Sequence, residues 1–272
     1  MRNHKNSSTR AQTKQSGVFV RSTGGSQSLE RGMRLLRAFL TGASELTNAE
    51  LAERCDLPRP TVSRLTRSLV DGGFLEFDAK QSVYRLAPVF LSLSVGYHQS
   101  HGELSSALPL LKEAARRESV NASLLVRNGM QMVYLASFRE GRGPIRRVVD
   151  TGSRIPIESY ASGHALIAAM QPVARTQLLD QLAQSHQAEW SQLHKRIQQS
   201  VAQYKRLGYC KLESVPGLFA VATALITPSG SLCVLVLTSS QLHEAHGAVS
   251  VGLLPSALKK LVQEITQFWG KT

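Results

Sequence analysis

A segment of twenty residues, 48–67, constrains the fold more than any other part of the chain, and it reads NAELAERCDLPRPTVSRLTR. Two short helices that pack across a tight turn need a small residue in the first helix and apolar residues around the turn and inside the second helix. The small residue is Ala52. The apolar positions hold Leu51, Cys55, Leu57, Val62 and Leu65. The segment predicts a helix-turn-helix, with Asp56 where glycine is usual; aspartate tolerates the left-handed conformation better than most residues.

Helix signals surround this motif. Residues 28–41 repeat leucine and methionine at helical spacing, which predicts a preceding helix. Thr47 and Glu50 have the spacing of a capping box, so we expect the first helix of the motif to begin there. The second helix is expected from about Pro60 to Asp71, where two glycines follow. Strand-like segments come next and predict a two-stranded wing; they are residues 73–78 and 82–87.

The outward side of the second helix has the chemistry of a DNA-binding surface, because it is basic and polar and no acid lies between residues 57 and 70. Arginine suits guanine edges and phosphates, and serine and threonine reach phosphates or bases. The residues expected to bind DNA on this helix are Arg59, Thr61, Ser63, Arg64 and Arg67. Thr47, Lys80 and Arg85 complete the expected DNA-binding set, although Lys80 and Arg85 fit a solvated turn equally well.

The formal net charge of +13 favours a polyanionic partner, either nucleic acid or an anionic membrane. No run approaches the roughly 18 apolar residues of a spanning helix, and the N-terminal region has no apolar signal-peptide core. We therefore expect a cytoplasmic protein with no membrane partner. Residues 1–25, polar and basic, are expected to form a disordered tail.

Cysteine and histidine spacing predicts neither a disulfide nor a metal site. The three cysteines are widely separated, at Cys55, Cys210 and Cys233. Two histidine pairs have helical i, i+3 spacing but no evident third ligand; they are His98 with His101 and His243 with His246. We expect no metal and no cofactor.

The second half of the chain predicts an α/β or α+β domain with a largely antiparallel sheet. Asn128-Gly129 between two apolar runs predicts a β-hairpin, and Pro228-Ser229-Gly230 predicts a second one. Helices are expected at residues 103–119, 162–170, 173–184, 188–206 and 247–269. Further strands are expected at residues 145–152 and 154–159.

From about residue 26 to residue 270 the sequence resembles the IclR family of bacterial transcription regulators. The resemblance rests on the helix-turn-helix region and on two later segments, GSRIPIESYASGHALIA and VPGLFAVATAL. It implies an α+β fold: a winged helix-turn-helix, a linker helix, and an effector-binding domain with a curved antiparallel sheet. The implied boundaries are residues 26–88, 89–102 and 103–272. A homodimer or homotetramer on a double-stranded DNA operator is also implied.

The resemblance also implies an effector site at three places. They fall on Ala161 and Ser162, on Ala220, and on Leu237 and Ser239. An inward Arg147 would favour a carboxylate effector, whereas strand alternation equally allows Val148 to point inward. The segment from Gly208 to Gly217 is shorter than is usual in the family, and either Cys210 or Glu213 is expected near its polar position.

Other functional classes fit less well. Ser162-Gly163-His164 lacks the G-x-S-x-G nucleophile elbow, so we expect no enzymatic activity. A winged helix that binds protein conflicts with the basic helix face, and a sequence-independent DNA binder leaves the second domain without a purpose. The expected function is therefore a sequence-specific transcription regulator, either repressor or activator, controlled by a small-molecule effector.

Overall fold

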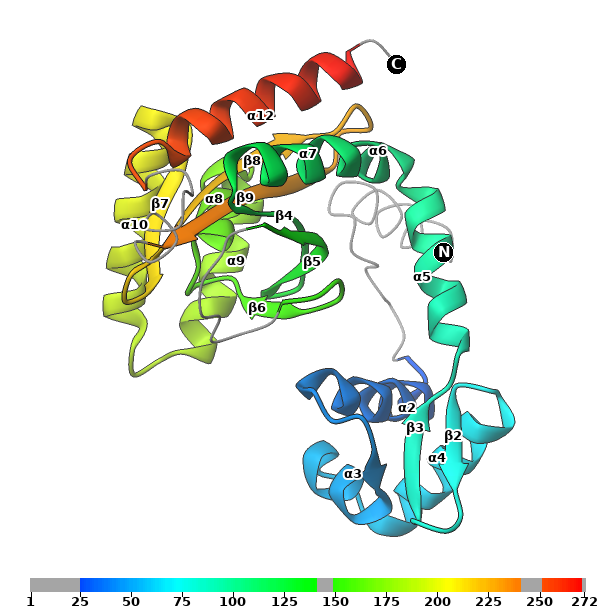
Figure 1. Ribbon diagram of the computed structural model, residues 1–272. Helices are drawn as coiled ribbons and strands as arrows, with labels where there is room; N and C mark the ends of the chain where they lie inside the picture. The colour runs from blue at the N-terminus through cyan, green and yellow to red at the C-terminus, as the bar shows by residue number, and fades with distance from the viewer. Residues whose placement is uncertain (1–24, 141–148, 241–250, 271–272) are drawn as a thin grey trace, which may run out of the picture. The chain divides into compact units, whose positions relative to one another are not determined.

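The computed structural model describes residues 25–140, 149–240 and 251–270 (Figure 1). The chain divides into two compact units, Met1–Gln99 and Ser100–Thr272. The predicted α+β class, with a winged helix-turn-helix and a curved antiparallel sheet, is confirmed.

The described part of the first unit contains four α-helices, the short 3-10 helix η1 and a three-stranded sheet. Its elements are α2 (Gln27–Ala38), η1 (Phe39–Thr41), β1 (Leu46–Thr47), α3 (Asn48–Cys55), α4 (Arg59–Asp71), β2 (Leu75–Asp78), β3 (Val83–Leu86) and α5 (Val89–Ser100). The sheet has the antiparallel order β1-β3-β2. Its core contains the apolar residues that the motif required, among them Leu51, Val62 and Leu65.

Local signals set the bounds of these helices. The capping box of Thr47 and Glu50 is present at the start of α3. Asp56 ends α3 in the left-handed conformation, with φ 49° and ψ 55°. The N–H groups of Asp56 and Leu57 donate to the carbonyls of Glu53 and Ala52, which is the Schellman pattern. The turn is therefore formed as expected, with aspartate at the glycine position.

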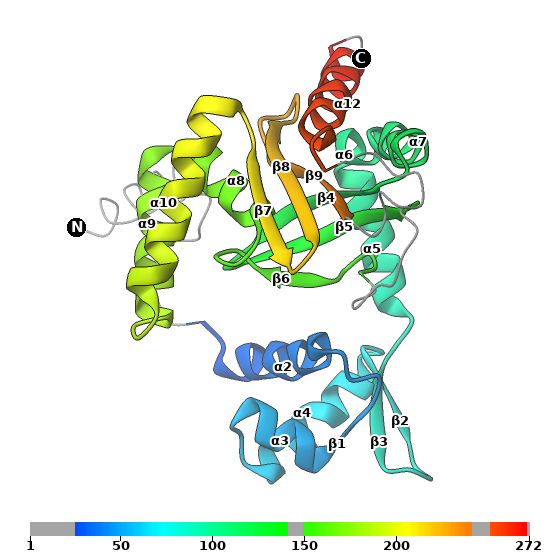
Figure 2. The ribbon, with the colours of Figure 1, turned by 60° about the vertical axis from the view of Figure 1, so that its left-hand side comes forward.

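The second unit is a six-stranded sheet with helices on both faces (Figure 2). Its helices are α6 (Gly102–Ser106), α7 (Leu108–Glu118), α8 (Ala161–Ala169), α9 (Pro172–Ser185), α10 (Trp190–Leu207) and α12 (Leu254–Trp269). Its strands are β4 (Asn121–Asn128), β5 (Gln131–Arg139), β6 (Arg154–Pro156), β7 (Cys210–Val215), β8 (Leu218–Ile226) and β9 (Leu232–Ser240). The strand order is β6-β5-β4-β9-β8-β7, and every pairing is antiparallel.

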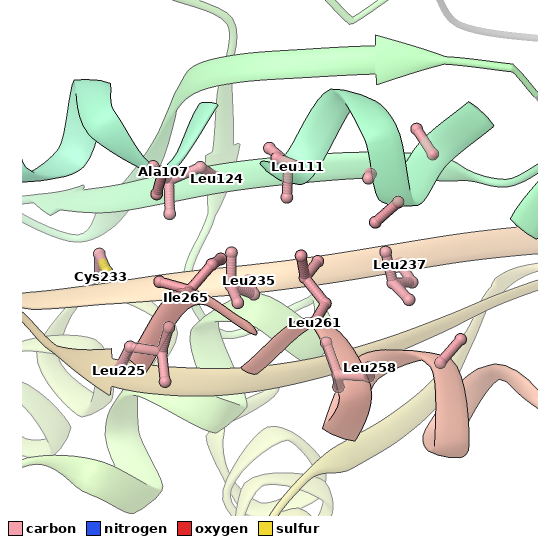
Figure 3. Close-up of a cluster of buried hydrophobic side chains, with 14 of the residues drawn as sticks. Ala107, Leu111, Leu124, Leu225, Cys233, Leu235, Leu237, Leu258, Leu261 and Ile265 are labelled. Carbon is pink, nitrogen blue, oxygen red and sulfur yellow. The ribbon is translucent and has the colours of Figure 1, made fainter. Parts of the chain in front are cut away.

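The two faces of this sheet bury different clusters. On one face, which we call the α12 face, Leu235 and Leu237 of β9 pack with α7 and α12 (Figure 3). On the other, which we call the α8 face, Val234 and Val236 pack with α8 and α10. Successive residues of β9 therefore alternate between two cores.

Three expectations about elements were inaccurate, and one strand was missed. The helix expected at residues 103–119 is divided into α6 and α7, because Pro109 has no N–H to donate to the carbonyl of Ser105. Of the strand expected at 145–152, residues 149–152 are irregular or turn, and the remainder lies outside the described residues. β7 was not predicted. The last helix begins at Leu254, beside Pro255, rather than near residue 247.

Both hairpins are confirmed. The first has a two-residue loop, Gly129 and Met130, and Gly129 takes a φ of 64°. Positive φ at the first loop position suits glycine, so Asn128 is the last strand residue rather than part of the loop. The second hairpin joins β8 to β9 through the expected Pro-Ser-Gly turn.

Candidate DNA-binding surface and effector site

Helix α4 presents the expected basic face to solvent. Arg59, Ser63, Arg64 and Arg67 are exposed and Thr61 is half-buried. Val62, Leu65 and Thr66 are buried on the opposite side. The first turn of α4 contains no acid, and its N-cap is Pro58, which makes no side-chain cap. The first N–H groups of α4 and its arginines can therefore act together on an anion such as a phosphate.

Polar contacts fix α4 against its neighbours. Asn48 at the start of α3 donates from Nδ2 to Ser63 Oγ over 3.0 Å. The buried Thr66 hydroxyl lies 3.2 Å from the Tyr84 hydroxyl of the wing. Because both contacts come from elements that pack on α4, the helix is held in a defined orientation relative to α3 and the wing.

The structure separates the remaining DNA-binding candidates by environment. Thr47 exchanges capping hydrogen bonds with Glu50. Arg85 is 2.9 Å from Glu45 and 3.2 Å from Asp78, and its hydrogen bond to Glu45 and the other carboxylate contacts raise the pKa of its guanidinium. Lys80 is exposed in the wing turn. Arg85 therefore braces the wing within the protein, while Lys80 faces solvent.

The expected effector residues do not all share one face of the sheet. Ala220 belongs to the α8 face, together with Ala161. Leu237 packs on the α12 face, among Leu258 and Leu261 (Figure 3). Ser239 pairs with Phe219, which packs against the same α12-face cluster. The structure therefore does not bring Leu237 and Ser239 together with Ala220, and Arg147 lies outside the described residues.

The start of α8 is tightly packed. Ala161 and Ser162 are almost fully buried, and Ser162 Oγ has no hydrogen-bond partner among the described residues. A Cβ added to Gly163 would lie 1.8 Å from the carbonyl oxygen of Ile157. Only glycine therefore allows α8 to approach the segment that precedes it, which explains Gly163 in this sequence.

His164 is structural in this arrangement. Its Nδ1 and Nε2 lie 2.8 Å from Ser200 Oγ and from the carbonyl oxygen of Glu158, respectively. Burial is the main cause that lowers the pKa of the imidazole. A neutral ring that donates to the carbonyl and accepts from Ser200 satisfies both contacts. With both ring nitrogens engaged elsewhere, His164 is not placed to activate Ser162.

Sequence reasoning missed two polar residues on the α8 face. Thr238 pairs directly with Ala220 on one side and with Asn121 on the other. Asn121 Oδ1 is buried and lacks a hydrogen-bond partner within the described residues. Cross-strand register was needed to find them, because the sequence alone does not say which alternate residues of β9 face α8.

The two residues expected near the shortened segment also differ. Cys210 lies in the α8-face core, and burial raises the pKa of its thiol to about 12. Glu213 is exposed and accepts a hydrogen bond from the Gly217 N–H at 2.7 Å. It pairs with Phe219, so it stands on the α12 side of the sheet.

The described ranges contain neither a cluster of metal ligands nor a membrane-spanning helix. In residues 25–140, 149–240 and 251–270, no three His, Cys, Asp or Glu side chains are grouped as metal ligands. His243 and His246 lie outside these ranges. No helix in the described part of the chain has the length and apolar character needed to cross a membrane.

Two family models match the chain. The IclR helix-turn-helix domain matches residues 28–79. The C-terminal domain of the bacterial transcriptional regulator IclR matches residues 95–259. The two matches correspond to the two compact units in order along the chain.

Individual proteins show the same relationship. The HTH-type regulator TsaQ1/TsaQ2 of Comamonas testosteroni is 27% identical over 252 residues, covering 89% of this chain and 88% of its own. An IclR-family regulator from Brucella abortus superimposes with a TM-score of 0.74 at 26% identity, covering 94% of both chains. An IclR homolog from Microbacterium hydrocarbonoxydans, complexed with 4-hydroxybenzoate, gives a TM-score of 0.70 at 19% identity and covers 90% and 100%.

The fold, the basic helix-turn-helix and both domain matches agree. The chain is a DNA-binding transcription regulator with an effector-binding C-terminal domain, and regulation rather than catalysis is the activity of such proteins. It belongs to the IclR family.

Proposed function

We propose that the protein binds one operator sequence in double-stranded DNA through α4. The observation that carries this proposal is the exposed basic face of α4, supported by a closed apolar core. Arg59, Arg64 and Arg67 contact bases and phosphates, and Thr61 and Ser63 add hydrogen bonds. Thr47 and Lys80 contact the backbone, and Arg85 acts mainly by holding the wing. A cytoplasmic location follows from this target.

The protein acts as a homodimer or homotetramer, so that two copies of α4 reach successive major grooves of a near-palindromic site. Exposed apolar side chains support self-association. On α2 and η1 they are Leu29, Met33 and Leu40, exposed by 59%, 47% and 50%. Large apolar side chains that are exposed together in a monomer are typical of a surface that is covered by another protein chain.

The effector is a small carboxylic acid bound on the α8 face of the domain formed by residues 103–272. The buried Ser162 hydroxyl at the start of α8 has no hydrogen-bond partner among the described residues, so a polar group of a ligand could pair with it. The Microbacterium homolog holds an aromatic acid. Arg147 is a further partner of the carboxylate in this proposal, and Ala161 and Ala220 line the site. Residues 89–102 form the linker helix from the DNA-binding domain, residues 26–88. By linkage, effector and operator change each other's affinity by the same factor.

Selection of binding sites from genomic DNA tests this function. Purified full-length protein is mixed with fragmented DNA at physiological salt, and the bound fragments are sequenced and footprinted. We expect one near-palindromic site. Equal recovery of all sequences, with affinity that falls steeply with salt, contradicts sequence-specific binding and leaves a non-specific DNA binder.

A further inference from the structure

Five residues stand side by side across the α8 face, one on each of five neighbouring strands. In order across the sheet they are Arg139, Asn121, Thr238, Ala220 and Leu212. Directly paired residues of antiparallel strands point to the same face with Cβ atoms about 5 Å apart. Because Ala220 and Leu212 pack against the α8-face core, the whole row faces that side.

The row changes steadily in character. Arg139 is charged and exposed, Asn121 and Thr238 are polar and half-buried, and Ala220 is apolar and buried. The matching row on the α12 face differs: Phe138, Ala122, Leu237 and Val221 are apolar, and the charged residue, the half-buried Lys211, lies at the opposite end. In this row the polar middle positions, Asn121 and Thr238, are therefore specific to the α8 face.

Asn121 is the informative member of the row. Its Oδ1 is buried without a hydrogen-bond partner in the described residues. One row further in, the comparable hydroxyls of Ser123 and Ser137 are paired with each other at 3.0 Å. A buried acceptor without a donor is costly to a protein, whereas a paired one is not. A carboxylate or a ketone cannot pair with Asn121 Oδ1, because both are acceptors and only an O–H or N–H group can donate a hydrogen bond to it.

We propose that this row selects an acid that also carries a hydroxyl or amide N–H donor, with Asn121 as the specificity-determining residue. The anionic group lies toward Arg139, the donor meets Asn121 Oδ1, and the remainder of the molecule lies over Thr238, toward Ala220. Neighbouring strands are about 4.8 Å apart, so a molecule of about five to eleven heavy atoms covers two or three strands of the row. This inference rests on the proposed acid-binding site and names its ligand class more narrowly.

The first test needs no ligand. Leucine has the shape of asparagine without the unpaired acceptor, so Asn121→Leu should raise the Tm of the free protein by about 2 °C or more. The control is Ser123→Ala, which breaks a satisfied pair and should leave the Tm unchanged or lower it. A lower Tm for Asn121→Leu shows that Asn121 serves the fold and overturns the proposal.

The second test uses acids that differ by one hydroxyl: lactate with propanoate, malate with succinate, and mandelate with phenylacetate. We expect a hydroxy acid to raise the Tm of the wild-type protein more than its partner does, and to bind by calorimetry at least tenfold more tightly. In Asn121→Leu that preference should disappear, with a loss of about ten- to hundredfold for the hydroxy acid alone. Arg139→Gln should weaken both members of a pair, whereas Arg127→Gln, on the same strand as Asn121 but at its far end, should weaken neither.

The outcomes separate this inference from the proposed function. If both members of a pair bind equally and Asn121→Leu changes neither, the site takes acids and Asn121 does not select among them. If no acid in the set raises the Tm, both the acid site and the selection by Asn121 are contradicted. Site-selected DNA binding is measured independently and is unaffected by either result.

Discussion

The two units place their functional side chains in opposite environments. In the first unit the candidate residues lie on the exposed side of α4, above a core that is already closed. In the second unit Ala161, Ala220, Asn121 and Thr238 lie on the covered α8 face, among residues that also form a core. A substitution on the exposed side of α4 can therefore alter DNA binding alone. A substitution on the α8 face changes both stability and effector binding, unless the strand register places the residue away from the packed core.

The largest effect is expected at Gly163. In Gly163→Ala the new Cβ would lie 1.8 Å from a backbone oxygen of Ile157, which cannot move aside as a flexible side chain can. We expect the free energy of unfolding to fall by about 4 kcal/mol, measured by urea denaturation. The control is Gly96→Ala in α5, where a Cβ meets nothing within 4 Å, and a gain of about 0.5–1 kcal/mol is expected. Equal stabilities for the two variants would show that α8 can move away from Ile157.

The next prediction tests the assignment of faces on β9. Leu237→Ala removes a fully buried side chain from the α12 face and should cost about 2–5 kcal/mol of stability. Thr238→Val keeps the volume of a half-buried residue on the α8 face, so stability should change by less than about 1 kcal/mol. The effector response should weaken in Thr238→Val and persist in folded Leu237→Ala. The reverse pattern would return Leu237 to the effector site.

Leu237 and Thr238 also show what could and could not be predicted from the sequence. In α3 and α4 the inward residues recur within three or four positions, so a stretch of twenty residues predicted both the buried set and the exposed basic set. On β9 every second residue faces α8, and a shift of one residue exchanges the faces. The residues expected from the sequence combine Ala220, which faces α8, with Leu237 and Ser239, which face α12, whereas Val236 and Thr238 face α8. The register of the β8–β9 hairpin and the pairing of β9 with β4, which is distant in sequence, resolve that choice.

Asn121 was missed for a related reason. At the start of β4 it reads as an ordinary polar residue beside a helix end. Its importance depends on having Thr238 and Arg139 as neighbours and on the burial of Oδ1, and none of these is a local property. Similarly, the sequence offers Arg85 as a phosphate ligand but does not show that Glu45, forty residues earlier, lies beside it.

On the exposed face of α4, a substitution should change operator binding without changing stability. Arg64→Ala should weaken operator binding by about 1–3 kcal/mol if the guanidinium contacts a base, while the free energy of unfolding changes by no more than about 0.5 kcal/mol. Fluorescence anisotropy on the selected operator at fixed salt measures the first quantity. Arg116→Ala removes the same charge from α7, where Arg116 pairs with Glu113, and should leave binding nearly unchanged. Similar losses in both variants would mean that only net charge matters.

The smallest effect is expected at the turn of the motif. Asp56 holds a left-handed conformation that glycine adopts without a steric penalty. Its carboxylate also lies at the C-terminal end of α3, where the helix dipole disfavours a negative charge. In Asp56→Gly both penalties are removed, but the unfolded chain gains flexibility, so the net gain should be only about 0.5 kcal/mol.

Asp56→Ala separates these terms, because it removes the charge and keeps the Cβ. We expect Asp56→Ala to be less stable than Asp56→Gly by about 1 kcal/mol in urea denaturation. The operator affinity of both variants should stay within a factor of two or so of the wild type, since neither change touches the outward face of α4. If Asp56→Gly loses stability instead, the aspartate side chain stabilises the turn, and the departure from glycine is an adaptation of this chain rather than a tolerated substitution. The first unit would then also contain a residue whose role the local pattern does not reveal.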